Sequence, residues 1–499
     1  MLAGALVALF TGAAVAQGTG LSVSPERPIF TPGLRASATW SDNVTLSEHD
    51  RSSDVVLEAS PYIAAHSLTP RARYDVFYQL RNFWRVREKE SHLFRHALNA
   101  NGSFALVDDR LWLDLAGYMG TISDAAGGPI SIDPASSFAN TTNVRSFTVS
   151  PWYRDRLGSL AGYELRYALT HAGGSSDYAL ADRRHQASAS IEGLERRFAT
   201  WNWRLFSRFE RREFDHGLEL DRRLSGAILF YRVSPELRLL GAIDYEQIDE
   251  VRNRDGENSG YGPGAGFDWT PNPRTHVTMV VSERYYGTVG KARAAYTTAR
   301  STTGIEFARS LLTSAESSLL MLDPAQLTAI GDTPGSSVLG NLIANGVVLP
   351  VGSALTQGLF TDSAVLDRRL TAFWGLRGVR NSLAVSAWAS NRESGTRLAS
   401  MGPAGAFSGE LRERGAAVSA RHRLDARSSV DLTLDHRNAR SSTGGFETRL
   451  GTLRVGYSTH LTRDTDAYAG YRYTRQSASG TGARYDENAI YGGIDMRFR

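Results

Sequence analysis

Three charged residues of one short segment, Asp431, Asp435 and Arg437, have a spacing that could support chemistry. Side chains two or four positions apart on a β-strand point to the same face. Two carboxylates that share a face can act as general acid and general base. The neighbouring Arg437 favours another interpretation, in which the segment is part of a ladder of ion pairs. We therefore expect a charged strand face that lines a polar space, and not a catalytic dyad.

No other residue pattern predicts catalysis. The sequence lacks the G-x-S-x-G, H-E-x-x-H and G-x-x-x-x-G-K-[ST] motifs of esterases, metalloproteases and nucleotide-binding loops. Asp215 and His216 are adjacent and could form an acid–base pair, but solvated loop charges are far commoner. The chain has no cysteine, so it can form neither a thiolate metal site nor a disulfide. We predict that the protein is not an enzyme and holds no cofactor or metal.

The basic residues are almost all arginine. Lysine occurs only at Lys89 and Lys291 among 56 basic side chains, a bias that either genome composition or function could produce. The guanidinium group binds carboxylates and phosphates through two parallel hydrogen bonds, which lysine cannot do. A polar space lined by arginine would select anionic or sugar-like solutes. The formal net charge of +4 is too small to indicate nucleic-acid binding.

The elements that must position these charges are β-strands. From residue 31 onward, segments of roughly 9–14 residues alternate between apolar and polar side chains, as strands with two unlike faces do. In one such segment, Val430, Leu432 and Leu434 alternate with charged and polar residues. The polar faces of several segments supply the predicted lumen-lining residues, which are Arg369, Arg377, Asp431, Asp435, Arg437, Arg454, Asp466 and Arg472.

The connections between these segments alternate in length. Tight turns at 234–236, 271–273 and 461–464 alternate with long polar stretches such as 42–52 and 121–142. Short turns at one rim and long loops at the other are typical of bacterial outer-membrane β-barrels, which have an even number of antiparallel strands. Counting segments inward from both ends predicts an all-β transmembrane barrel of about 22 strands, within a range of roughly 20–24.

The N-terminus predicts export. Leu2–Phe10 is an apolar stretch, and Ala14 and Ala16 form the A-x-A pattern of a signal peptide that is cleaved after Ala16. No later run approaches the roughly 18 apolar residues of a transmembrane helix. We therefore expect an exported protein without a helical anchor.

The predicted division of the chain follows from this cleavage site. A signal peptide at 1–16 precedes a short periplasmic segment at 17–30 and a barrel at 31–499. Because the strand pattern begins so soon after the cleavage site, a receptor with a large plug domain ahead of its first strand is disfavoured.

One region, residues 313–366, breaks the strand pattern. Asp323 followed by Pro324 is typical of a helix start, with Asp as the N-cap and Pro in the first turn. Residues 337–345 could form a second short helix. Strand parity places both ends of the region outside the cell. Long ordered loops often carry function, so two roles are open: a constriction or gate of the lumen, and a surface appendage on the rim.

The last segment resembles an assembly signal. The segment has a polar aromatic residue, a glycine, a hydrophobic residue and a second aromatic residue at Tyr491, Gly493, Met496 and Phe498. This spacing resembles the one that the outer-membrane insertion machinery reads on the last strand of its clients. In many clients the aromatic residue is the last one, whereas here Arg499 follows it. Met496 and Phe498 share one strand face, as a lipid-facing strand requires. We expect the barrel-assembly machinery as a partner.

Three further stretches point to a family. They are T-W-S-D-N-V-T-L at 39–46 with E-A-S-P at 58–61, S-P-W-Y-R at 150–154 continuing to E-L-R-Y at 164–167, and R-Y-Y-G at 284–287. They resemble the outer-membrane β-barrel proteins associated with the PEP-CTERM/exosortase sorting system, which are found near exopolysaccharide biosynthesis genes. The resemblance spans most of the mature chain. It implies a place in the outer membrane and a link to the export of extracellular polysaccharide or surface proteins.

These patterns together predict a location and a role. We expect an outer-membrane channel or export component for polar material, linked to exopolysaccharide or PEP-CTERM surface-protein systems. The alternative is a structural or adhesive protein whose barrel displays loops and transports nothing. The expected partners are the lipid and lipopolysaccharide of the outer membrane, the barrel-assembly machinery and exopolysaccharide export components, but not nucleic acid.

Overall fold

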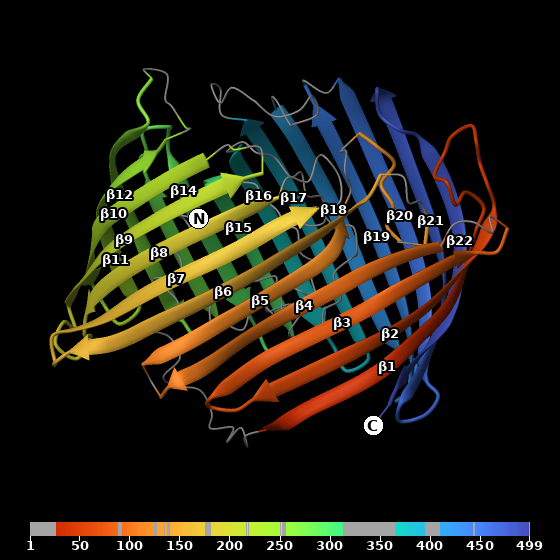
Figure 1. Ribbon diagram of the computed structural model, residues 1–499, viewed down its shortest axis with the longest axis horizontal. Coiled ribbons are helices and arrows are strands. Elements are labelled where there is room, and N and C mark those ends of the chain that lie inside the picture. Colours follow the sequence, from red (N-terminus) through yellow and green to blue (C-terminus); the bar gives the residue numbers. More distant parts are fainter. Residues whose placement is uncertain are drawn as a thin grey trace.

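The computed structural model describes residues 26–87, 92–108, 110–122, 127–133, 135–136, 140–174, 181–215, 217, 219–249, 251, 256–312, 365–394, 410–442 and 445–498. Within these ranges the chain forms 22 β-strands (Figure 1). They are β1 (Glu26–Ser41), β2 (Asp54–Leu68), β3 (Ala72–Arg85), β4 (His92–Val107), β5 (Leu111–Ile122), β6 (Thr142–Leu157), β7 (Ala161–Gly174), β8 (Asp182–Gly193), β9 (Trp201–Phe214), β10 (Glu219–Arg232), β11 (Leu237–Ile248), β12 (Ser259–Asn272), β13 (Thr275–Ser282), β14 (Val289–Thr297), β15 (Ser301–Leu312), β16 (Val365–Arg377), β17 (Asn381–Ser394), β18 (Glu410–Arg423), β19 (Ser428–Ser441), β20 (Phe446–His460), β21 (Thr465–Gly480) and β22 (Tyr485–Arg497). In the described part of the chain, no helix is long and apolar enough to cross a membrane.

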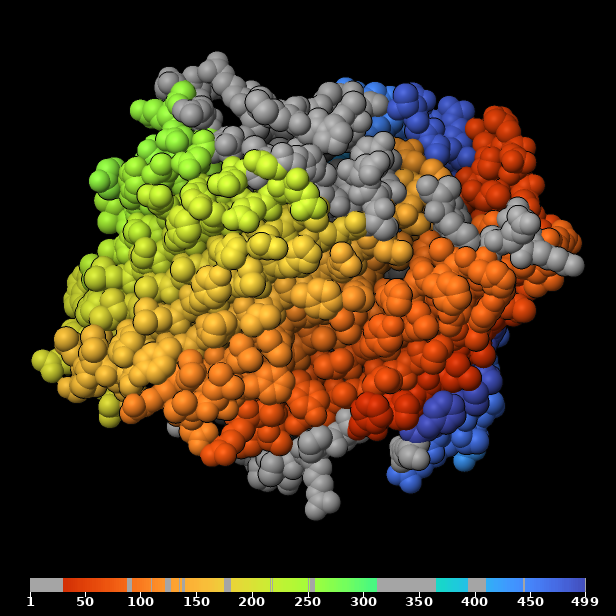
Figure 2. Space-filling model, in the orientation of Figure 1, coloured from red at the N-terminus to blue at the C-terminus, as the bar shows by residue number. Residues whose placement is uncertain are grey.

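The strands form one sheet that closes on itself. Strands that follow one another in the sequence pair antiparallel, and a ladder between β1 and β22 joins the two ends of the sheet, from Gly33 opposite Arg497 to Ser41 opposite Ala489. Figures 1 and 2 show the tilted wall in which the first strands lie beside the last. Closure leaves no sheet edge, so backbone polar groups are paired within the wall, as the interior of a membrane requires. The predicted all-β barrel of 22 strands is confirmed.

Alternation along the strands separates a lipid face from a lumen face. On β19, Leu434 is 43% exposed, whereas its neighbour Asp435 is only 4% exposed. Large apolar side chains are exposed in the same way on other strands, for example Val455 of β20 and Ile490 of β22. In a membrane barrel the apolar side chains face the lipid and the polar ones face the lumen. The polar faces identified in the sequence therefore form the inner wall.

Long and short connections lie at opposite ends of the barrel. The longest connections, 42–53, 123–141, 313–364 and 395–409, all follow odd-numbered strands, and tight turns such as 461–464 follow even-numbered ones. Outer-membrane barrels have their short turns in the periplasm and their long loops outside the cell. The end at which β1 begins and β22 ends is therefore the periplasmic end.

Two predicted boundaries shift in the structure. β1 begins at Glu26, inside the predicted periplasmic segment 17–30, because its pairing with β2 continues as far as Glu26 opposite Leu68. β16 begins at Val365, so the end of the predicted insertion 313–366 belongs to the wall. The predicted signal peptide with Ala14 and Ala16, and the predicted helices of the insertion, lie outside the described residues.

Candidate functional site on the inner wall

The connection between β5 and β6 folds inward against the lumen face of the wall. The amide of Ile130 donates a hydrogen bond to Oε1 of Gln476 over 3.1 Å, and the hydroxyl of Tyr485 donates to the carbonyl of Ile130 over 2.5 Å. Gln476 and Tyr485 lie opposite each other on β21 and β22, and each is 2% exposed. We name the described residues 127–133, 135 and 136 the inner loop. Its partners show that it lies inside the barrel and not above the rim.

Buried ion pairs fix the inner loop to the wall. Nη1 of Arg472 lies 2.5 Å from Oδ2 of Asp133, and Nη2 lies 3.2 Å from Oε1 of Glu487. The hydroxyl of Ser136 donates to the same Glu487 carboxylate over 2.5 Å. The side chain of Arg472 is 1% exposed. A buried guanidinium that lost these partners would be left as an uncompensated charge, so the loop and the wall depend on each other.

Neighbouring arginines also set the protonation of the inner loop. Burial by itself would raise the pKa of Asp133, but the positive charges of Arg472 and Arg81 outweigh burial and hold this pKa below its ordinary value of 3.8. Arg81 is in turn paired with Glu58, whose Oε1 lies 2.7 Å from the Nε of Arg81. Asp133 is therefore ionised throughout the neutral and mildly acidic range.

Apolar side chains complete the contact between the inner loop and the wall. Ile130 is 7% exposed and belongs to one buried cluster with Leu46 and Tyr485. Ala135 belongs to another, which includes Phe83 of β3. Leu46 comes from the β1–β2 connection, so two extracellular connections meet on the same part of the inner wall. Burial of such side chains stabilises their position by about 1.5–3 kcal/mol for each large one.

A second buried cluster lies on the facing part of the wall, around the β13–β14 link. Nη2 of Arg284 lies 2.8 Å from Oδ2 of Asp244, and Nη1 lies 3.6 Å from Oε2 of Glu246. Glu246 also pairs with Arg222 at 2.7 Å and accepts a hydrogen bond of 3.2 Å from the hydroxyl of Tyr286. Arg284 and Tyr286 belong to the R-Y-Y-G stretch seen in the sequence. That stretch therefore anchors the link on the lumen side.

The second cluster has room because β12 presents glycines to it. Glycines occupy alternate positions from 260 to 266, all on the lumen face. A Cβ at Gly262 would lie 2.8 Å from Oδ1 of Asp244 and 3.0 Å from Nη1 of Arg284. The charged side chains of Asp244 and Arg284 thus occupy the space on the lumen side of β12. Side chains larger than glycine on β12 would fill that space.

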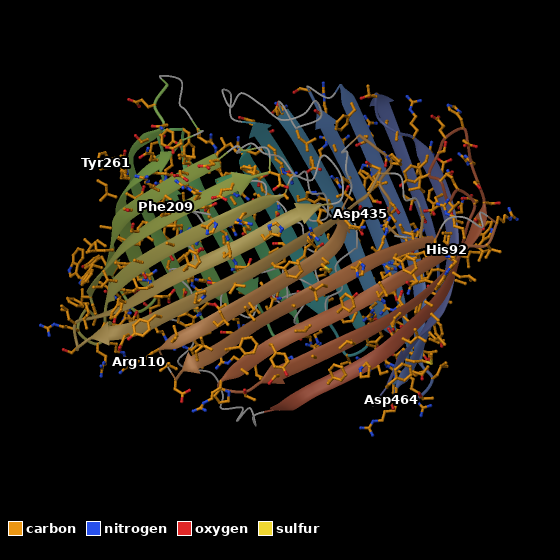
Figure 3. The ribbon with its side chains drawn as sticks, viewed as in Figure 1. His92, Arg110, Phe209, Tyr261, Asp435 and Asp464 are labelled. Atoms are coloured by element: carbon orange, nitrogen blue, oxygen red, sulfur yellow. The ribbon has the colours of Figure 1, made fainter. Side chains whose placement is uncertain are left out.

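A third group of charges lies on β16–β19 and contains the predicted ladder. Arg437 pairs with Glu413 of β18, and Arg392 of β17 lies 3.4 Å from the same carboxylate. The ladder therefore runs diagonally across strands: Glu413 is in register with Ala439 and Ser390, and the long side chains of Arg437 and Arg392 reach it from the diagonal positions. Asp435, labelled in Figure 3, makes no hydrogen bond to a described residue. Asp431 lies on the same lumen face of β19 as Asp435, and it is in register with Gly456 of β20.

Two other predicted lumen residues lie on the inner wall. Nε of Arg454 donates to the hydroxyl of Tyr491 over 2.9 Å, and its guanidinium lies 4.8 Å from the centre of that ring. Arg369 lies 3.7 Å from Asp367 and is partly buried. Both arginines are therefore held by neighbours on the wall.

The remaining two predicted lumen residues lie at the periplasmic rim. Asp466 pairs with Arg497, close to the start of β21 and the end of β22. Arg377 is the last residue of β16 and is exposed. The alternation pattern alone assigned these residues to a face but could not give their depth.

The residues of the predicted assembly signal occupy both faces of β22. Tyr491 and Gly493 lie on the lumen side, in register with Gly470 and Tyr468 of β21. Met496 points to the opposite face of β22, and Phe498, just beyond the strand, is 50% exposed. The polar aromatic residue and the glycine therefore face inward while the hydrophobic ones face lipid.

Sequence reasoning missed the inner loop. Asp133, Gln476 and Glu487 were not among the predicted lumen residues, although they hold the loop in place. The one signal in the sequence was the pair Ile130 and Ile132 within an otherwise polar connection. Isolated apolar residues in a long loop indicate that part of the loop is buried, but not against which strands.

No protein-family model matches the chain, and no curated protein matches it in sequence. Solved structures do resemble it in fold. The siderophore receptor PirA of Acinetobacter baumannii has a TM-score of 0.50 at 7% identity, over 95% of this chain and 81% of that one. The FrpB iron transporter of Neisseria meningitidis (F3-3 variant) has a TM-score of 0.48 at 10% identity, over 94% and 81%. A mutant of the ferric enterobactin receptor PfeA of Pseudomonas aeruginosa has a TM-score of 0.43 at 9% identity, over 94% of this chain and 80% of that one.

The fold defines the class of protein. A closed antiparallel barrel of 22 strands with an apolar outer face and long loops at one end is an outer-membrane β-barrel. The protein therefore belongs to the bacterial outer membrane, and the solved barrel with a TM-score of 0.50 is named as a siderophore receptor, not as an enzyme.

Proposed function

We propose that this outer-membrane barrel is a channel for polar material and that its inner loop narrows the passage. The observation that carries the proposal is the ion-paired triad of Asp133, Arg472 and Glu487, which holds the loop inside the barrel. A loop that served only for surface display would not need buried ion pairs on the inner wall. Charged rings and narrowed passages are the means by which pores select solutes.

We further propose that the solutes are anionic or sugar-like, and that transport is linked to exopolysaccharide or PEP-CTERM surface-protein systems. On the lumen face, Trp112 and Trp152 stack with ring centroids 5.6 Å apart. The guanidinium groups of Arg154 and Arg166 lie 5.3 Å and 5.1 Å from the centre of the Trp152 ring. Aromatic faces offer apolar contact area for sugar rings, and arginine binds carboxylates through two hydrogen bonds.

Conductance of the refolded protein in a planar lipid bilayer tests the channel. We expect steady conductance that falls when sugar polymers are added to the bath. Asp133→Asn should raise the conductance or make it fluctuate, because the inner loop loses one of its ion pairs. The control Asp486→Asn removes an exposed carboxylate that pairs with Arg51 outside the lumen, and it should conduct like the wild type. Silence from correctly folded, heat-modifiable protein would favour the surface-display alternative.

Block of this current tests the solute class separately. Acidic oligosaccharides should reduce the current of the wild type, and Trp152→Ala should weaken that block. The control Trp201→Ala removes a tryptophan that is 52% exposed on the outer face and should not change the block. A channel that conducts but is never blocked by acidic oligosaccharides would contradict the proposed solute while leaving the channel intact.

A further inference from the structure

The outer face of the barrel carries a row of arginines at its extracellular end. Arg309 of β15 lies opposite Arg368 of β16, which lies opposite Asn391 of β17. Asn391 lies opposite Arg412 of β18, and Arg412 lies opposite Arg440 of β19. Neighbouring strands are about 4.8 Å apart, so the row from Arg368 to Arg440 spans about 14 Å. Four of five adjacent strands thus place a guanidinium group at the same level.

This row lies immediately above the apolar band of the wall. Two positions nearer the periplasm, the outward places from β15 to β19 belong to Phe307, Leu370, Ala389, Arg414 and Asn438. Leu370 is 43% exposed. Phe307, Leu370 and Ala389 form the apolar floor of a groove of about 610 Å³. Its charged lining includes Arg368, Arg412, Arg414, Arg440 and Glu447. The boundary between the apolar band and the extracellular rim is the level of the lipid headgroups.

The positive charge of the groove is only partly balanced. Arg412 pairs with Glu410 at 2.6 Å, and Glu447, which lies opposite Arg440, pairs with Arg449 at 2.9 Å. Arg368, Arg414 and Arg440 are exposed, and none of them makes an ion pair with a described residue. Arg414 lies next to the row, opposite Asn438. Three guanidinium groups on one small surface therefore have donors free for an anion from outside the chain.

We propose that this groove, which we name the arginine groove, binds the phosphate groups of lipid A, the phosphorylated glucosamine lipid of lipopolysaccharide in the outer leaflet. Guanidinium groups bind phosphate through two parallel, charge-assisted hydrogen bonds. The apolar floor at Phe307 and Leu370 would lie against the acyl chains of the same molecule. A soluble anion would satisfy the guanidinium groups but would leave this floor unused. The site lies on the outer face, so the inference does not depend on the proposed channel.

The other side of the barrel differs at the same level and supplies a control. There, Arg211 of β9 pairs with Asp221 of β10 at 2.9 Å, and Arg183 of β8 lies opposite Glu213. Arg145, Arg183 and Arg223 are exposed outward arginines on β6, β8 and β10, separated from the arginine groove by several strands. A triple substitution of these three removes the same charge from the outer face without touching the groove.

Binding of fluorescently labelled lipid A to the full chain, folded in phospholipid vesicles, tests the proposal. The triple variant Arg368→Gln, Arg414→Gln and Arg440→Gln should bind lipid A about tenfold or more weakly than the wild type, because charge-assisted hydrogen bonds are lost. The control Arg145→Gln, Arg183→Gln and Arg223→Gln should bind like the wild type. Lipid A from which the phosphates have been removed should bind the wild type as weakly as intact lipid A binds the groove variant.

Several results would overturn the assignment. Unchanged binding by the groove variant, or an equal loss in the control variant, would remove the groove as the site. Equal binding of phosphate-free lipid A would remove phosphate as the recognised group. Competition by millimolar inorganic phosphate would reassign the groove to soluble anions. If the triple variant does not fold, two other measurements decide the question. One compares the two lipids on the wild type, and the other measures lipid A binding by the double variant Arg414→Gln with Arg440→Gln.

Discussion

Arginines on the two faces of this barrel have opposite surroundings. On the inner face, Arg472 and Arg284 are each 1% exposed and each contacts two carboxylates. On the outer face, Arg368 and Arg440 are exposed and make no ion pair with a described residue. Arg472, Arg368 and Arg440 all lie on strands of the same sheet, and they differ in the face to which the side chain points.

The difference separates two uses of one side chain. A buried inward arginine is removed from water and must be neutralised by the chain itself, so it acts as a structural anchor. An outward arginine at the headgroup level keeps its hydration or meets a lipid anion, so it has no need of a carboxylate from the same chain. Substitutions should therefore affect folding on the inner face and lipid binding on the outer face.

Arg472→Ala should have the largest effect on stability. It leaves Asp133 and Glu487 as buried carboxylates without their shared cation, and breaking a buried pair from one side costs about 3–5 kcal/mol. Urea-induced unfolding in lipid vesicles measures the loss in the free energy of unfolding. Arg475→Ala on the outward face of the same strand is the control, because its nearest paired carboxylate is 3.8 Å away at Asp486. Equal stability of the two variants would remove the contrast between the faces.

Gly262→Val should destabilise the second cluster. The added side chain would overlap the Arg284–Asp244 pair, and overpacking of this kind costs about 1–3 kcal/mol of unfolding free energy. Gly241→Ala on the neighbouring strand is a control, because a Cβ there meets nothing within 4 Å. The same unfolding experiment compares the two. A tolerated valine at this position would mean that the alternate glycines of β12 are not required by the ion pair.

Two substitutions on the third group of charges distinguish a cross-strand ladder from one along a single strand. Glu413→Gln removes the carboxylate that Arg437 and Arg392 share, and we expect a loss of about 1–3 kcal/mol. Asp435→Asn should cost less, because Asp435 makes no hydrogen bond to a described residue. A larger loss for Asp435→Asn would show that Arg437 depends on the carboxylate of its own strand.

Acid should release the inner loop only at low pH. The pKa of Asp133 is lowered on folding, so its contribution is fully present above the unfolded value of 3.8 and is lost as pH falls through the lower folded value. We expect no change in conductance from this group between about pH 7 and about pH 5. Only at a pH well below 3.8, where Asp133 takes up a proton in the folded protein, should the wild type come to behave as Asp133→Asn does at neutral pH. A transition of the wild type near neutral pH, absent from Asp133→Asn, would contradict the charge state of the triad.

Local pattern was sufficient to predict the wall. Alternation at Val430, Leu432 and Leu434 gives a strand with one lipid face, and the parity of long and short connections gives an even strand number near 22. The lumen face of Asp431, Asp435 and Arg437 was also predicted, because parity along a strand is a local property. The depth of each residue within the barrel was not predicted, since Arg377 and Asp466 proved to lie at the periplasmic rim.

The sequence by itself determined which side chains face lipid and which face the lumen, because the bilayer imposes a period of two on every strand that crosses it. It also determined the class of protein. Only the tertiary structure decided which charges meet. Asp133 and Arg472 are separated by 339 positions in the chain, and Arg368, Arg414 and Arg440 come together only through the register of four neighbouring strands. Strand pairing places distant positions side by side, and no local spacing records that placement.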